Sequence, residues 1–135
     1  MKRLIIAACA LLVLVSCTTG GSQTIDQPEA STIVYYFHGK QRCKTCVAIE
    51  RLSAEVVNNH FSDAVASGKL AYRVVDYTDA ENQPLADRYE VGWSSLIVAG
   101  SEGWENLTDM AFSCALKDSA EFVHQLSNAI EEKLQ

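Results

Sequence analysis

The sequence has little positive charge and few of the motifs that mark common enzymes. Its 135 residues contain 11 Lys and Arg against 17 Asp and Glu, a formal net charge of −6 at pH 7. A nucleic-acid-binding domain needs a basic face to displace counterions, so no nucleic-acid partner is expected. The sequence also lacks a phosphate-binding loop, a carboxylate pair, a serine triad and any internal repeat. These absences leave the five cysteines as the main candidates for chemistry.

No hydrophobic run is long enough to cross a bilayer. A cationic start, residues 1–3, is followed by twelve apolar residues, 4–15. A helix of that length spans about 18 Å, whereas a hydrocarbon core is about 30 Å thick. The run is therefore interpreted as the hydrophobic part of a secretory signal. It ends in Leu-Val-Ser-Cys, residues 14–17, which resembles the lipobox of bacterial lipoproteins.

The lipobox resemblance implies that a signal peptide, 1–16, is removed and that Cys17 is lipidated, with a diacylglycerol on its sulfur and an acylated amine (palmitate). The alternative is an ordinary secretory signal with an incidental cysteine. Residues 17–31 are then the lipidated cysteine and a flexible tether, whose polar part reaches about 20 Å. Thr18 is not the aspartate associated with inner-membrane retention. The resemblance therefore implies an extracytoplasmic protein that is lipid-anchored to a bacterial membrane, the outer membrane by this sorting rule.

Residues 32–135 are predicted to form one α/β domain. The run at 32–37 is β-branched and aromatic without polar alternation, as in a strand buried on both faces. Apolar residues at helical spacing follow Cys43, and Asp118 with Glu121 forms a capping box for a last helix. The predicted order is β-α-β-α-β-β-α: strands at 32–37, 70–75, 95–99 and 107–112, helices from 43 with a kink near 58–59, from 84 and from 118, a stop at Gly68 and a hairpin at 100–103.

The motif Cys43-Lys44-Thr45-Cys46 lies between a buried strand and a helix. At a helix N-terminus, unpaired N–H groups and the positive end of the helix dipole favour a thiolate, and Arg42 and Lys44 are expected to act in the same direction. A thiolate attacks disulfides, and a second cysteine one turn later can resolve the mixed disulfide. The spacing predicts that Cys43 is the nucleophile and Cys46 the resolving thiol.

With this motif in this place, residues 32–134 resemble the thioredoxin superfamily. The strand 33–37, the Cys43–Cys46 turn, the strand ending at Asp76, Tyr89-Glu90-Val91 and the terminal helix carry the resemblance. It implies a thioredoxin-like fold, with a central four-stranded mixed sheet flanked by helices.

Three positions depart from the family pattern. Ser94 or Ser95 stands where the family has a cis-proline, and we expect a trans peptide there because a non-proline cis bond costs about 2.5–4 kcal/mol. Arg42 replaces the usual aromatic residue before the first cysteine. Phe37 aligns with a buried acid, so proton transfer to Cys46 needs another group or water. The adjacent His38 is one candidate, although adjacency in sequence does not establish hydrogen-bond reach, and the favoured alternative is that it satisfies a strand end.

Cys114 is the third thiol of the mature chain. A fourth strand parallel to the first would bring it to the sheet edge that bears Cys43. It could then exchange with the pair, or complete a Cys₃His zinc site with Cys43, Cys46 and His38. The alternative is a small buried residue under the last helix. A single CxxC is a poor zinc signature, so we expect neither a metal nor another cofactor.

The sequence therefore predicts a membrane-anchored, extracytoplasmic thiol–disulfide oxidoreductase that uses a Cys43/Cys46 dithiol. Its direction is open. Expected partners are protein thiol or disulfide substrates and a membrane redox partner, and the chain is expected to be a monomer. The alternative is a non-catalytic thioredoxin-like binding module whose CxxC is a structural disulfide or a metal clip.

Overall fold

The computed structural model describes residues 30–135, which form a mixed α/β domain. The predictions for the signal peptide, Cys17 and most of the tether fall outside these residues. The elements in chain order are β1 (Thr32–His38), α1 (Lys44–His60), α2 (Ser62–Ala66), β2 (Leu70–Asp76), the 3₁₀ turn η1 (Ala80–Asn82), α3 (Gln83–Arg88), β3 (Ser95–Gly100), β4 (Gly103–Asn106), α4 (Thr108–Cys114) and α5 (Ser119–Leu134).

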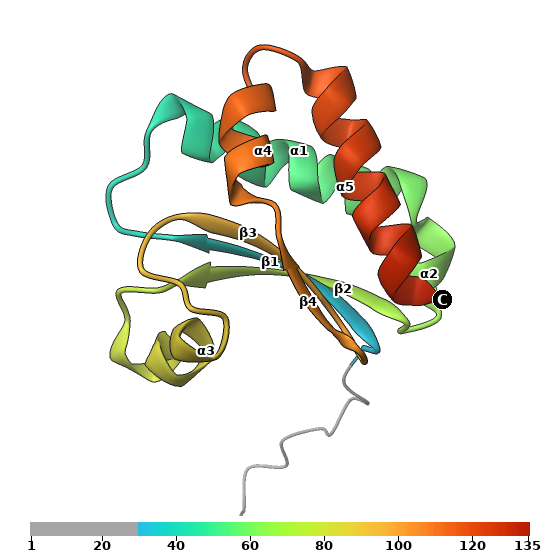
Figure 1. Cartoon of the computed structure of the whole chain (residues 1–135), viewed down its shortest axis with the longest axis horizontal. Helices are drawn as coiled ribbons and strands as arrows, with labels where there is room; N and C mark the ends of the chain where they lie inside the picture. Colours follow the sequence, from blue (N-terminus) through green and yellow to red (C-terminus); the bar gives the residue numbers. More distant parts are fainter. Residues whose placement is uncertain (1–29) are drawn as a thin grey trace, which may run out of the picture.

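The four strands form one mixed sheet in the order β2-β1-β3-β4 (Figure 1). β1 lies in the middle, parallel to β2 and antiparallel to β3, and β4 pairs with β3 at the edge. Because β1 is enclosed by two neighbours and covered on both faces, six of its seven residues are buried. This agrees with its apolar, non-alternating sequence. The predicted strands at 32–37, 70–75 and 95–99 are all present.

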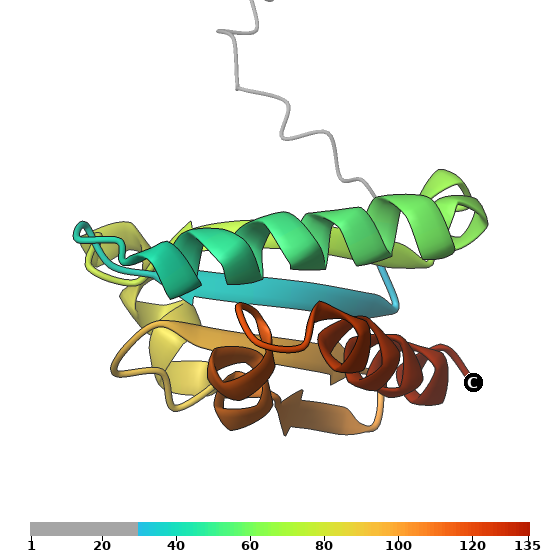
Figure 2. The same ribbon diagram turned by 90° about the horizontal axis from the view of Figure 1, so that it is seen from above.

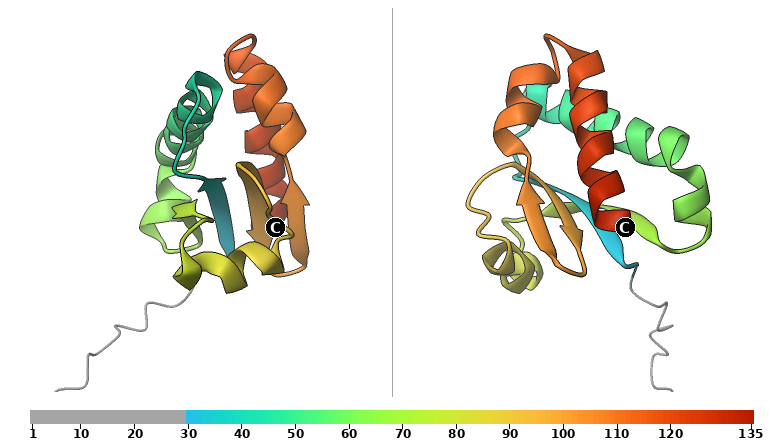
Figure 3. Two further views of the ribbon diagram at one scale, coloured as in Figure 1. Left: turned by 90° about the vertical axis from the view of Figure 1, so that its left-hand side faces the viewer. Right: turned by 45° about the vertical axis from the view of Figure 1, so that its right-hand side comes forward.

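Helices cover both faces of the sheet (Figure 3). Val34 and Tyr36 of β1 point into a core shared with α1, α4 and α5, which contains Ile49, Phe122 and Leu126. The alternate β1 residues point to the opposite face, where they meet the segment around α3; they are Ile33, Tyr35 and Phe37. The period of two in β1 therefore assigns Tyr36 to the face that carries α1.

The first helical segment is interrupted, as the sequence predicts, although the break falls at Phe61 rather than at 58–59. α2 ends at Ala66, and Gly68, the second residue after it, has φ of +73°. The Gly68 N–H donates to the Val65 carbonyl and the Lys69 N–H donates to the Ala64 carbonyl. This is a Schellman motif, and the positive φ explains the glycine.

The predicted strand at 107–112 is wrong. β4 is instead the exposed segment Gly103–Asn106, which completes the hairpin that begins at Gly100, and residues 108–114 form α4. Leu107, Ala111 and Ala115 are buried at four-residue intervals, which is a helical rather than a strand period. The element order therefore contains one helix more than predicted between the hairpin and the last helix.

The last helix begins as the sequence predicts. The Asp118 carboxylate accepts a hydrogen bond of 3.0 Å from the Glu121 N–H, which satisfies one of the free donors at the start of α5. The buried face of α5 consists of Phe122, Leu126, Ala129 and Ile130. Within residues 30–135, no helix is both long enough and apolar enough to span a membrane.

Candidate functional site

The two cysteines of the CxxC motif lie where β1 passes into α1. β1 ends at His38, a loop of residues 39–42 follows, and Cys43 is the N-cap of α1. Figure 2 shows this loop beyond the end of the sheet, and α1 then runs back along the sheet. Cys43 is exposed and Cys46 is buried beneath it. One sulfur is therefore open to a partner and the other is protected by the core.

The sulfurs are in direct contact. The Sγ atoms of Cys43 and Cys46 are 2.7 Å apart, and the Cys46 N–H donates a hydrogen bond of 3.2 Å to Cys43 Sγ. The Cys46 thiol, followed by its backbone N–H, lowers the pKa of Cys43, and Thr45 makes smaller contributions. A disulfide bond is about 2.0 Å long, so the pair can close with little movement. The arrangement gives one accessible thiol with a lowered pKa and one adjacent buried thiol.

The cation at position 42 does not act as the sequence suggests. Arg42 donates a hydrogen bond to the Glu50 carboxylate, and its guanidinium lies 6.0 Å from the centre of the Tyr36 ring. Lys44 is exposed in the first turn of α1. The leading causes of the lowered pKa of Cys43 are hydrogen bonds from Cys46. Hydrogen bonds at the start of α1 therefore lower the pKa of Cys43, the effect that the sequence suggests for the charges of Arg42 and Lys44.

No hydrogen bond joins His38 to either cysteine within residues 30–135. His38 is half-buried at the end of β1, and its Nδ1 lies 3.0 Å from the Gly39 carbonyl oxygen. His38 also faces Asp76 across the β1–β2 pair. Two hydrogen bonds from Thr78 are the main cause that lowers the pKa of the Asp76 carboxyl, and the nearby His38 lowers it further. The structure therefore favours the strand-end interpretation of His38 over a role in proton transfer.

Ser94 and Ser95 precede and begin β3. No peptide bond in the described part of the chain is cis, which agrees with the expected trans bond. Ser95 pairs with Phe37 near the end of β1, so the start of β3 lies beside the loop that leads to the cysteines. The Ser95 hydroxyl is buried and donates to the Trp93 carbonyl at 2.9 Å. Trp93 is 53% exposed, and its ring lies 5.3 Å from that of Phe112.

Cys114 is the last residue of α4 rather than the end of a strand. It is half-buried and packs against the core that also contains Cys46. No hydrogen bond joins it to Cys43 or Cys46, and residues 30–135 contain no group of three or more His, Cys, Asp or Glu placed to hold a metal ion. The structure therefore does not assemble the Cys₃His set, and it favours the packing interpretation of Cys114.

Sequence reasoning missed Tyr36. Its side chain is fully buried on the α1 face of the sheet, and its hydroxyl has no hydrogen-bond partner in residues 30–135. Burial is the largest cause that raises the pKa of Tyr36, and the neighbouring Cys46 raises it further. The signal was present in the sequence, because alternation along β1 places Tyr36 on the same face as the helix that begins at the cysteines.

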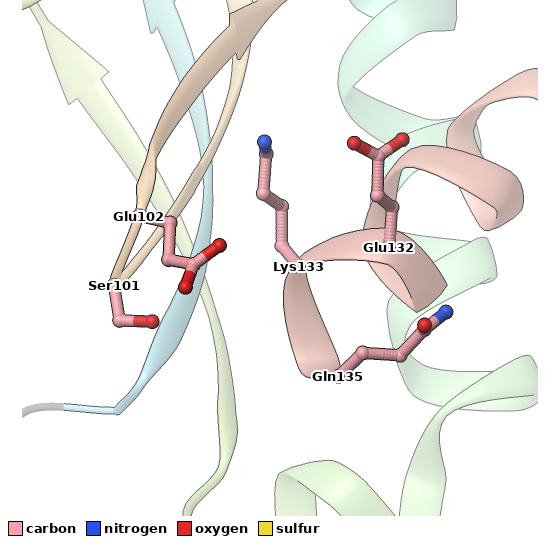
Figure 4. Close-up of a pocket in the computed structure, with 5 residues that line it drawn as sticks. All are labelled: Ser101, Glu102, Glu132, Lys133 and Gln135. Carbon is pink, nitrogen blue, oxygen red and sulfur yellow. The ribbon is translucent and has the colours of Figure 1, made fainter.

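A separate hollow of about 390 Å³ lies at the other end of the domain (Figure 4). The Thr32 hydroxyl donates to the Lys133 carbonyl at 2.9 Å, which places this hollow near the start of β1. Seven residues of strand, about 20 Å, separate that end from the cysteines. The hollow is lined by the β3–β4 turn and the end of the chain: Ser101, Glu102, Glu132, Lys133 and Gln135. It lies apart from the candidate site.

A scan against protein-family models gives no match, and a search of curated proteins gives none either. The inference about function therefore depends on the geometry around Cys43 and Cys46.

The lowered pKa of Cys43 leads to a first prediction. Because a thiolate reacts and a thiol does not, alkylation of Cys43 should remain fast to lower pH than alkylation of free cysteine, then slow as the pH falls through the lowered pKa. Cys46→Ala removes the largest cause and should shift the profile to higher pH. Mass spectrometry after timed iodoacetamide pulses, with Cys114 as the internal reference, measures the profile. Identical profiles in wild type and Cys46→Ala would contradict this origin.

Proposed function

We propose that this protein is an extracytoplasmic thiol–disulfide oxidoreductase that uses Cys43 and Cys46. The contact that supports the proposal most directly is the 2.7 Å approach of the exposed Cys43 sulfur to the buried Cys46 sulfur at the start of α1. Cys43 would attack a substrate disulfide, and Cys46 would then attack Cys43 and release the substrate thiol. Protein thiols or disulfides would be the substrates, and the protein needs no cofactor for this exchange.

The domain architecture supports assignment to a thioredoxin-like fold. A parallel β1–α1–β2 unit precedes an antiparallel β3–β4 hairpin and a terminal helix, and the dithiol lies between β1 and α1. The additional helix α4 and the trans peptides around Ser94 and Ser95 depart from the family pattern. Substrate docking along the edge near Ser95 is therefore proposed to differ from that of proline-containing members.

The proposed lipid anchor at Cys17 would attach the domain through residues 17–31 to the start of β1. Cys43 follows the other end of that strand. With an anchor at one end of the sheet and the dithiol at the other, the active face would point away from the lipid surface. This orientation suits substrates and a redox partner that approach from the surrounding compartment.

The proposal is tested by turnover. Purified domain 32–135 should accelerate the dithiothreitol-dependent reduction of a disulfide-bonded test protein beyond the rate with dithiothreitol alone, on the order of tenfold or more at micromolar protein, because the lowered pKa of Cys43 raises the fraction of its thiolate form. Cys114→Ser should retain this rate, since no hydrogen bond joins Cys114 to either sulfur within residues 30–135. A wild-type rate no greater than that of the free thiol would instead support a binding module.

A further inference from the structure

Tyr36 has a hydroxyl group that no neighbour satisfies. Its side chain is fully buried, and the hydroxyl has no hydrogen-bond partner within residues 30–135. A buried donor without a partner is uncommon and costs folding free energy. The same side chain belongs to the core that contains Cys46, and the nearby Cys46 contributes to its raised pKa. The unsatisfied donor therefore lies beside the buried sulfur of the dithiol.

The surroundings of Tyr36 keep it in this place. β1 is fixed by β2 and β3 on its two sides, so the strand cannot turn the side chain away. The Arg42 guanidinium lies over the Tyr36 ring and is held by Glu50 of α1. The Arg42–Glu50 hydrogen bond therefore joins the loop before Cys43 to α1, with the Arg42 guanidinium over the Tyr36 ring. The hydroxyl is thus held by elements that flank both cysteines.

We propose that the Tyr36 hydroxyl is a hydrogen-bond donor reserved for the Cys46 thiolate that forms during resolution of the mixed disulfide. This inference rests on the proposed function and adds a residue to it. In the resting protein the Tyr36 hydroxyl has no hydrogen-bond partner within residues 30–135. When Cys46 ionises, a donor already stands beside the new charge. A hydrogen bond to this thiolate stabilises it relative to the neutral thiol, so more of the mixed disulfide holds Cys46 in the form that attacks Cys43.

Tyr36 acts here as a donor and not as a base. Burial raises its pKa, so the phenol keeps its proton at neutral pH and cannot accept another. In the resolution step, Cys46 loses its proton and its sulfur attacks Cys43 Sγ. The Cys43–Cys46 bond forms as the bond from Cys43 to the substrate sulfur breaks. The departing substrate thiolate receives the electron pair and takes up the proton that Cys46 released.

The two chemical steps can be followed separately with a chromogenic aromatic disulfide. In a Cys114→Ser background, attack by Cys43 should release one equivalent of aromatic thiol, and resolution by Cys46 should release the second. Tyr36→Phe should leave the first phase unchanged and slow the second about tenfold at neutral pH, the loss expected for one hydrogen bond to an ionised group. The difference should narrow as the pH rises, because more Cys46 then ionises without help.

Tyr35→Phe is the matched control, because Tyr35 is an equally buried tyrosine on the same strand but on the opposite face of the sheet. It should alter neither phase. Tyr36→Phe keeps the ring and removes an unsatisfied group, so thermal unfolding should show no loss of stability. Equal second phases in Tyr36→Phe and wild type would overturn this inference alone. Absence of a second phase in wild type would contradict the proposed function as well.

Discussion

Cys43→Ser is expected to reduce disulfide reduction to the rate of the free thiol, so the whole acceleration expected for wild type, on the order of tenfold or more, should be lost, as when the nucleophile is removed from a catalytic unit. A serine hydroxyl is not ionised near neutral pH and forms no bond to sulfur that could be exchanged. The remaining geometry should survive, because Cys43 is the N-cap of α1 and serine is among the preferred N-cap residues. The lost activity would then be chemical in origin.

Two measurements check this result. The dithiothreitol-coupled assay gives the rate, and thermal unfolding of the same preparation should show a midpoint no lower than that of wild type. Cys114→Ser provides the matched control, since it also exchanges sulfur for oxygen but at the end of α4. Retained turnover in Cys43→Ser, or its loss in Cys114→Ser, would contradict the assignment of Cys43 as the nucleophile.

Most of the framework could be predicted because local rules and burial agree there. The run 32–37 has a single interpretation as a buried strand, Gly68 fits a helix end, and Asp118 caps α5 through its carboxylate. The prediction for 107–112 is wrong because a short apolar run suits a strand or a helix equally. Its helical period becomes visible only when Leu107, Ala111 and Ala115 are seen to share one buried face.

The candidate site shows the same division between local and long-range information. The closeness of Cys43 to Cys46 follows from the CxxC spacing, because two residues separate them at a helix start. The partner of Arg42 is Glu50, eight residues later and two turns along α1, and no neighbouring residue in the sequence indicates it. The place of Tyr36 beside Cys46 depends on how α1 crosses β1, which is a tertiary property.

Cys46→Ser is expected to stop the reaction halfway and to accumulate mixed disulfides between Cys43 and its substrates. In wild type the Cys46 sulfur is held 2.7 Å from Cys43, so resolution is intramolecular. Well-oriented intramolecular reactions have effective concentrations on the order of 10⁵ M or more, far above any external thiol. Without that sulfur, the mixed disulfide decays only through external thiols, and its lifetime should rise by orders of magnitude.

Two readouts follow the trapped species. With the chromogenic disulfide, Cys46→Ser in the Cys114→Ser background should release one equivalent of aromatic thiol where the parent releases two. In cells that express the full chain, non-reducing gels should show higher-mass bands that collapse on reduction. These bands should be absent when Cys43→Ser is added to Cys46→Ser. Because trapping needs an accessible Cys43 and a substrate disulfide but no turnover, it separates the two proposed classes. Absence of such bands in Cys46→Ser would instead support a binding module.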